Sequence, residues 1–254
     1  MSEHDRSDGA RVVTSADRRG VEGLLRYLGS PSNLDAVWLA SALAVPVVLA
    51  LLRPILPFDY FWPLVQGRVI VDSGRIPAEN GFLYTLPPGA PFVNQPWLAE
   101  VILYLTYRLA GHEGNLVLLA VLLGLSTALI MDAALRAGAP PKGVAIATLL
   151  GLPFVMYGAG ARTQMFAFPC FALVLRYIAL DPDRTRLRSF LPVLGAVVLW
   201  SICHGSFVLA PLMLGVRALS RLFDRERPRA APMLELALAA LGTALNPLGP
   251  TVYV

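Results

Sequence analysis

Residues 57–115 read PFDYFWPLVQGRVIVDSGRIPAENGFLYTLPPGAPFVNQPWLAEVILYLTYRLAGHEGN, and this stretch decides the architecture of the chain. It follows a strongly apolar run, and almost everything after it is apolar with very short breaks. Turn-forming residues recur within it at Ser73-Gly74, Asn80-Gly81 and Pro87-Pro88-Gly89. We predict a semi-folded cap at one membrane face, with the remaining polar residues gathered beneath it.

The composition places the chain among membrane proteins. Of its 254 residues, 56% are hydrophobic and 15% are charged, and the mean hydropathy is +0.61, outside the usual range of a soluble domain. Because apolar runs of spanning length recur, we predict an all-α integral membrane protein. The first run starts near Asp35, behind a polar segment (1–34), so it is a retained span and not a secretory signal.

Several other protein classes are excluded by residue patterns. The sequence pI of 9.3 does not indicate nucleic-acid binding, because the arginines form short clusters beside apolar runs. Cys170 and Cys203 lie inside apolar runs, where cysteine is a small buried hydrophobe, and no metal-ligand spacing or disulfide framework is visible. The motifs of soluble enzymes, such as GxSxG, HExxH and a phosphate-binding glycine loop, are absent from the sequence.

We predict about seven transmembrane helices. They cover residues 36–56, 116–135, 143–156, 164–180, 190–203, 206–219 and 233–245. The first contains Pro46 and Pro54, which a membrane helix tolerates because neighbouring groups satisfy the freed carbonyls. The interval 190–219 is read as two short helices hinged at His204-Gly205, and a single long tilted helix is the alternative.

The segment 97–110 fixes the topology. Its 14 residues would span about 21 Å, less than the ~30 Å hydrocarbon core, and it carries Glu100 and Arg108 among aromatic residues that suit an interface. If it lies along the outer surface, most basic residues fall on the cytoplasmic side, and if it spans, every later basic cluster moves outside. We therefore predict an interfacial helix, a cytoplasmic N-terminal segment (1–34), and an extracytoplasmic cap loop (58–115) on a multi-pass inner or plasma membrane protein.

This topology brings four polar features to one face of the membrane. They are the loop with Asp59, the turn at 160–164, the break at 203–205 and the pair Asn246-Pro247. Polar features that are separated by long apolar runs but meet on one side are the pattern expected of a site at a membrane surface.

Three residues are the leading candidates for chemistry. Asp59, beside three aromatic residues in restricted water, is a candidate general base toward an acceptor hydroxyl, and its alternative role is a helix cap or a solvated charge. Arg162, with Gln164, can grip phosphate oxygens bidentately, or it can simply extend its charge to the interface. His204 is an ionisable group between apolar segments, which indicates function by default, although a lone histidine is also a common packing residue.

Four further residues complete the candidate set. Glu100 is a second candidate acid, or it pairs with Arg108 or a neighbouring loop. Asn246 either lines the site or caps the last helix. Trp62 and Trp97 are candidates for substrate binding, and an aromatic belt at the interface is their simpler interpretation.

The order of motifs resembles that of a group of bacterial polytopic membrane proteins. The motifs are Asp59-Tyr60-Phe61-Trp62, G-R-x-I-x-x-x-G-x-I-P from Gly67, Trp97-Leu98-x-Glu100, Ala161-Arg162-x-Gln164, Trp200-x-x-x-His204-Gly205-x-Phe207 and Leu245-Asn246-Pro247-x-Gly249. The group in turn is similar to the GT-C superfamily of glycosyltransferases, which depend on polyprenyl-phosphate sugars, as the protein mannosyltransferases do. The resemblance covers roughly residues 35–253.

The resemblance implies a site and a reaction. Asp59 would be the acid of the first outer loop, 65–72 and 97–110 its juxtamembrane helices, and Arg162 a ligand of the lipid phosphate. The activity implied is transfer of a sugar from a polyprenyl-phosphate carrier to an extracytoplasmic acceptor, with the leaving-group charge offset by arginine or a divalent metal ion. Superfamily members continue beyond the seventh span, and we expect this chain to lack further C-terminal spans.

Two other functions remain open at this point. A transporter or flippase of a lipid-linked substrate should show polar groups at mid-membrane depth and broken helices. Only His204, and Asp132 near the inner end of its span, approach that pattern. A non-catalytic membrane subunit should tolerate Asp59→Asn and Arg162→Ala without any change in phenotype. The sugar, the acceptor, the cofactor and the oligomeric state do not follow from the sequence.

Overall fold

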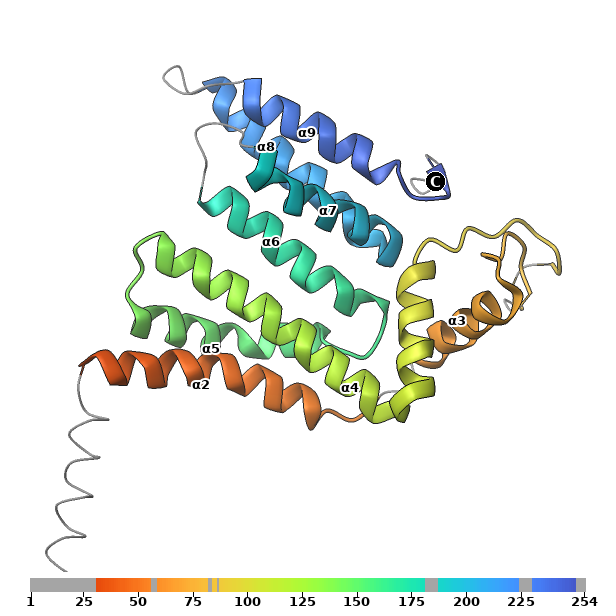
Figure 1. The fold of residues 1–254 in the computed structure, drawn as a ribbon, viewed down its shortest axis with the longest axis horizontal. Helices are drawn as coiled ribbons and strands as arrows, with labels where there is room; N and C mark the ends of the chain where they lie inside the picture. Colours follow the sequence, from red (N-terminus) through yellow and green to blue (C-terminus); the bar gives the residue numbers. More distant parts are fainter. Residues whose placement is uncertain are drawn as a thin grey trace, which may run out of the picture.

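The fold is helical throughout the part of the chain that the computed structural model describes, residues 31–55, 59–81, 84–85, 87–180, 187–223 and 230–249 (Figure 1). The helices are α2 (Pro31–Leu51), α3 (Phe61–Ser73), α4 (Trp97–Arg136), α5 (Pro141–Gly158), α6 (Ala167–Ala179), α7 (Leu187–Cys203), α8 (Leu209–Phe223) and α9 (Ala230–Thr243). The 3-10 turns η1 (Thr163–Phe166) and η2 (Gly205–Val208) lead into α6 and α8. The prediction of an all-α fold is confirmed for these residues, which add only one isolated β-bridge, between Glu79 and Pro91.

Four helical stretches in the described residues are long and apolar enough to cross a membrane. They are Asn33–Leu51, Trp97–Arg136, Pro141–Gly158 and Gly205–Phe223. Three shorter apolar helices, Thr163–Ala179, Arg188–Cys203 and Ala230–Thr243, fall below that length. The structure therefore supports a membrane protein with four candidate spans, and the count of seven stays a prediction.

The apolar helices lie side by side in one layer, in which α4 packs between α2 and α6 while α5 packs on α2 (Figure 1). Helices α6 to α9 share a second core cluster around Trp200 and Phe190, which are both almost fully buried. Helix α3 and the first part of α4 stand across one end of the layer (Figure 1). This end is where the predicted cap residues lie.

The outward surfaces of the layer are strongly apolar. Exposed examples are Val48 and Leu49 on α2, Val121 and Leu125 on α4, Leu150 and Phe154 on α5, and Leu212 and Val216 on α8. Apolar area on this scale is rare on soluble monomers, and it suits helices that face lipid. Polar groups such as Asn115 and Glu235 are instead buried between helices.

Helix α4 is divided by a sharp bend at Ala110 and Gly111. Gly111 has φ 65° and ψ −156°, a conformation that glycine adopts easily because it has no Cβ. The part before the bend runs across the end of the layer, and the part after it runs within the layer (Figure 1). The predicted boundary between an interfacial helix (97–110) and a span therefore coincides with a real break in the helix.

The first predicted span is wrong at its C-terminal end. Helix α2 stops at Leu51, five residues before the predicted limit, so Pro46 lies inside the helix and Pro54 lies after it. Proline disfavours helical conformation at the preceding residue and removes a donor, which explains why Arg53 and Pro54 stand outside. The rest of the prediction at this end, residue 56, lies outside the described residues, as do residues 1–30 of the predicted N-terminal segment and Phe58 of the predicted cap.

The ambiguous interval 190–219 forms two helices. Helix α7 ends at Cys203, His204 is extended with φ −163° and ψ 139°, and η2 begins at Gly205. Helices α7 and α8 both contribute to the cluster around Trp200 and both pack against α9. The alternative of one long tilted helix is therefore wrong.

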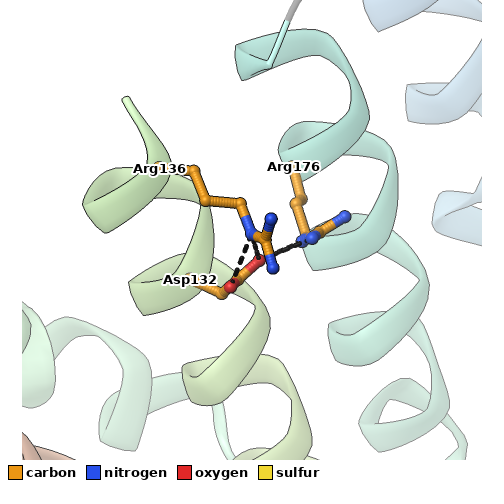
Figure 2. A network of polar contacts seen from close by, with 3 residues as sticks. All are labelled: Asp132, Arg136 and Arg176. Atoms are coloured by element: carbon orange, nitrogen blue, oxygen red, sulfur yellow. Dashed lines mark hydrogen bonds and ion pairs between the residues drawn. The ribbon is translucent and has the colours of Figure 1, made fainter. Parts of the chain in front are cut away.

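The end of the layer opposite the cap carries a small charge network (Figure 2). The Nε group of Arg136 donates to both carboxylate oxygens of Asp132, at 2.8 and 2.9 Å, within α4. Arg176 from α6 donates to the same carboxylate at 2.6 Å and so joins two helices that are distant in sequence. Two arginines on one aspartate leave net positive charge at this end.

The cap helices meet at an unusually close contact. Helix α3 is longer than the predicted 65–72 and ends at Gly74, whose left-handed backbone lets its N–H bond to the Ile70 carbonyl. A Cβ built on Gly67 would lie 2.1 Å from the carbonyl oxygen of Glu100, so only glycine fits there. This contact presses α3 against the first turn of α4 and helps to fix Glu100 in place.

Candidate functional site

One cavity beneath the cap collects most of the predicted site residues. Its volume is about 230 Å³, and we call it the cap cavity. It is lined by Asp59, Trp62, Pro63, Phe92, Val93, Asn94, Pro96, Glu100, Arg162, Thr163, Gln164 and His204. Six of the eight predicted residues are in this set, and they come from the first loop, α3, α4, η1 and the α7–η2 break.

Asp59 and Arg162 meet at the mouth of the cap cavity although 103 residues separate them. The Nη1 group of Arg162 donates to Asp59 Oδ2 at 3.1 Å, and its Nη2 group donates to the Gly158 carbonyl at 3.2 Å. Asp59 adopts a left-handed backbone with φ 55°, which costs an L-residue roughly 1 kcal/mol and sets the direction of the side chain. Its side chain is 70% exposed, so the expectation of a water-poor environment for this carboxylate is wrong.

Glu100 is the buried acid of the cap cavity, with only 1% of its surface exposed. Asn94 donates to its Oε2 at 2.7 Å, and the predicted partner Arg108 instead lies over the Tyr104 ring. Burial raises the pKa of Glu100 to about 7, and the hydrogen bond from Asn94 opposes part of that rise. The carboxyl group can therefore change its charge near neutral pH.

His204 lies at the break between α7 and η2 and is one of the residues that line the cap cavity. Its Nδ1 atom accepts a hydrogen bond from the Ser206 amide at 3.1 Å and lies 2.7 Å from the Ser206 hydroxyl. Burial lowers the pKa of His204, and the positive charge of Arg162 lowers it further. The imidazole is therefore held in its neutral form at neutral pH.

The remaining predicted residues divide into two groups. Trp62 and Gln164 line the cap cavity, and the Gln164 backbone carbonyl accepts a hydrogen bond from the Ala167 amide. Trp97 and Asn246 are not among the lining residues. Asn246 donates to the Ser201 carbonyl at 2.8 Å and accepts from the Leu248 amide at 3.0 Å, which makes it a tie between α7 and the C-terminal turn.

A second cavity of about 180 Å³, the arginine pocket, adjoins the first because Arg162 lines both. Its other lining residues are Arg53, Pro54, Ile55, Tyr60, Leu116, Tyr157, Gly158, Ala159, Gly160 and Ala161. Arg53 donates through Nη1 to the Met156 carbonyl, which holds its guanidinium beside the end of α5. Two guanidinium groups therefore share a pocket at the end of the apolar helices.

The residues of the cap cavity do not fit a divalent metal ion. Asp59 and Glu100 are the only acids that line it, and Asp59 is already paired with Arg162. Within the described ranges, no group of three or more His, Cys, Asp and Glu side chains is placed to hold a metal. The reaction considered below is therefore built from the side chains of this chain alone.

Sequence reasoning missed three polar partners. The first is Asn94, which bonds Glu100, and the second is Arg53, which lines the arginine pocket. In the sequence, Asn94 looks like an ordinary loop residue and Arg53 like an ordinary interface residue. The third is a buried network in which Arg217 of α8 pairs with Glu235 of α9, while Tyr177 donates to the second oxygen of Glu235 at 2.6 Å. Two opposite charges in consecutive apolar runs were the available signal.

Comparisons with known proteins leave the geometry as the basis for function. No protein-family model, curated protein or solved structure matches this chain at a significant level.

Proposed function

We propose that this chain is a membrane glycosyltransferase of the GT-C type, which moves a sugar from a polyprenyl-phosphate carrier to an acceptor on the extracytoplasmic face. The observation that carries the proposal is the cap cavity, in which an ion pair (Asp59 with Arg162), a buried acid (Glu100) and a histidine (His204) surround one space. Acid, cation and hydrogen-bond donor are the groups that glycosyl transfer from a phosphate requires.

The proposed topology has seven spans, with the N-terminus in the cytoplasm and the cap outside. Two features support it: the bend of α4 at Gly111, and the arginines around Asp132 at the end away from the cap. Cysteine substitutions tested with a membrane-impermeant thiol reagent should label from outside near the cap and from the cytoplasm at the exposed control Lys142. The positions for the outer set are 59, 68, 162 and 204, because Asn246 is buried. Cytoplasmic labelling at two or more of these four would contradict the proposal.

The arginine pocket is the proposed place for the lipid phosphate. Arg53 and Arg162 supply two positive charges, and a guanidinium binds phosphate oxygens through paired N–H donors. The pocket lies at the end of α2 and α5, whose surfaces are apolar, so a lipid tail can run along the helices while its phosphate reaches Arg162. The sugar then occupies the cap cavity on the other side of Arg162.

Glu100 is the proposed proton acceptor, in preference to Asp59. A general base works best when its pKa lies near the working pH, and Glu100 has a pKa of about 7. Asp59 is exposed and bonded to Arg162, so its proposed role is to orient that guanidinium. This assignment reverses the order of importance that the sequence suggested.

The proposed step is a single displacement at the anomeric carbon of the sugar. The acceptor hydroxyl oxygen forms a bond to that carbon while its proton moves to the Glu100 carboxylate. The bond from the carbon to the phosphate oxygen breaks, and the phosphate leaves with the electron pair. Arg162 stabilises the negative charge that develops on the leaving phosphate.

The decisive experiment measures release of polyprenyl phosphate by the full chain in nanodiscs, by mass spectrometry, from a panel of polyprenyl-phosphate sugars with a cell-envelope extract supplied as the source of acceptor. Glu100→Gln should lower the rate by about 10²–10⁴-fold, because it removes the base. The matched control is Asp72→Asn, which alters an exposed carboxylate on α3 that pairs with Arg68 on the same helix. Its rate should equal that of the wild type.

The outcome separates the proposal from its rivals. If Glu100→Gln releases polyprenyl phosphate as fast as the wild type, Glu100 is not the base. If the wild type moves labelled lipid across the bilayer and releases no phosphate from any donor, a flippase is favoured. A non-catalytic subunit would show neither activity, and cells would tolerate Glu100→Gln and Arg162→Ala.

A further inference from the structure

A short chain of hydrogen bonds leads from the core to the ring of His204. The indole Nε1–H of Trp200 donates to the Ser206 hydroxyl at 3.0 Å. That hydroxyl lies 2.7 Å from His204 Nδ1, and the Ser206 amide also donates to the same nitrogen at 3.1 Å. Trp200 is 1% exposed, so the chain is anchored on a rigid side chain.

The directions of these bonds are fixed by chemistry. An indole N–H and a backbone N–H can only donate, so the Ser206 oxygen accepts from Trp200 and His204 Nδ1 accepts from the amide. Nδ1 must then carry a lone pair, and the Ser206 hydroxyl proton is free to point at it. In a neutral imidazole the proton consequently resides on Nε2.

In the cap cavity, a His204 ring with its proton on Nε2 is suited to donate a hydrogen bond. His204 lines the cavity together with Arg162. Because Ser206 occupies Nδ1, Nε2–H is the donor that the His204 ring can offer to a ligand. A neutral imidazole with a protonated Nε2 cannot accept a proton at that atom, so it is unsuited to act as a base toward a substrate in the cavity. An N–H donor beside a guanidinium is instead suited to an anionic oxygen.

We propose that Ser206, backed by Trp200, is a positioning residue that holds His204 as an Nε2–H donor. His204 and Arg162 together bind an anionic phosphate oxygen of the lipid substrate at the boundary between the arginine pocket and the cap cavity, both of which Arg162 lines. This inference deepens the proposed function, since it names the second donor to the leaving phosphate. It gives His204, which the sequence marked as a candidate catalytic residue without a stated role, the role of an oxyanion donor.

The test uses the full chain with ¹⁵N-labelled histidine in detergent micelles at neutral pH. The chain has three histidines, so variants at His112 and His204 assign the resonances by difference. The expected ring of His204 is neutral with its proton on Nε2. Addition of a short-chain polyprenyl phosphate should shift the Nε2 resonance, and inorganic phosphate should do so only at higher concentration.

Variants separate a positioning role from simple packing. Ser206→Ala removes one of the two bonds to Nδ1 and should weaken polyprenyl phosphate binding about five-fold, the effect of one hydrogen bond, whereas Ser206→Thr keeps the hydroxyl and should restore it. The matched control is Ser201→Ala, because the Ser201 hydroxyl donates to the Val198 carbonyl of its own helix. That variant should bind like the wild type.

Three results would overturn the inference. They are a ring with its proton on Nδ1 or on both nitrogens, an Nε2 resonance that polyprenyl phosphate leaves unchanged, and equal affinity for inorganic phosphate, which would remove the lipid from the proposal. If the ring behaves as expected and no donor releases its phosphate, the binding role of His204 holds while the proposed transferase activity fails.

Discussion

Two arginine–carboxylate pairs in this molecule show opposite designs. Arg217 and Glu235 lie between α8 and α9 with side chains 4% and 0% exposed, and Tyr177 bonds the second oxygen of Glu235. Arg162 and Asp59 lie at the cap, with side chains 34% and 70% exposed, and each borders a cavity. In the first pair, both carboxylate oxygens of Glu235 are bonded to protein groups, whereas the second pair borders the cap cavity.

The difference separates a structural pair from a site. A buried pair gains little beyond the cost of removing its charges from water, so its value lies in holding helices in one arrangement. In the second pair Arg162 lines two cavities and Asp59 lines one of them, so there is room for a ligand beside this pair. Capacity of this kind is useful only when a ligand arrives.

The largest predicted effect concerns the closed pair. Arg217→Leu leaves Glu235 buried without its cation and should lower the free energy of unfolding by about 3–5 kcal/mol. Thermal unfolding in detergent measures this loss. The double variant Arg217→Leu, Glu235→Leu should recover most of the lost free energy of unfolding. If Arg217→Leu alone were as stable as the wild type, the buried pair would not have the structural role proposed for it.

The next effect is the pH dependence of stability from Glu100. Its pKa is raised from 4.5 to about 7 in the folded chain, so the contribution to stability is complete below pH 4.5 and is lost as the pH rises through 7. The loss amounts to about 3 kcal/mol, from 1.36 kcal/mol per pH unit. In Glu100→Gln, thermal stability should no longer fall between pH 4.5 and 7. If this variant lost stability with pH as steeply as the wild type, a group other than Glu100 would be responsible.

A smaller effect is expected at the open pair. Arg162→Lys keeps the charge but loses the paired donors, so polyprenyl phosphate binding should weaken about ten-fold, and Arg162→Ala should weaken it about 100-fold. Equilibrium binding to the purified chain measures both. Arg68→Ala, on the exposed face of α3, provides the matched control and should bind normally. Equal binding by Arg162→Ala would show that this guanidinium does not contact the phosphate.

The smallest effect is expected at the network of Figure 2. Asp132 is 37% exposed, and Arg176 is 27% exposed, so solvent screens their attraction. Asp132→Asn should cost at most about 1 kcal/mol of unfolding free energy, as for other partly exposed pairs. A loss as large as that of Arg217→Leu would mean that burial does not decide the strength of these pairs.

The helices could be predicted because their limits are written in local sequence. The C-terminal end of α7 and the start of η2 follow from the polar break at His204-Gly205. The bend of α4 follows from Gly111, which comes directly after the short aromatic segment 97–110. The end of α2 was misplaced because the apolar run continues past Pro54, and the sequence pattern alone treated that proline as internal.

The partners within the site were harder to predict. Asp59 and Arg162 could be placed on one face by counting spans, but their contact depends on how η1 and the first loop fold. The bond from Asn94 to Glu100 depends on a loop without regular structure, and the pairing of Arg217 with Glu235 depends on the rotation of two helices about their axes. Neither the conformation of that loop nor the pairing of those two side chains could be predicted from the pattern of apolar residues.

The bend at Gly111 has a consequence for size. A straight helix of 40 residues would be about 60 Å long, twice the ~30 Å hydrocarbon thickness, and its first turns would project far into the aqueous phase. Folding it at one glycine turns those first turns across the end of the helical layer and carries Glu100 against Gly67. A single glycine thus lets one continuous helical segment cross the end of the layer in its first part and run within the layer in its second.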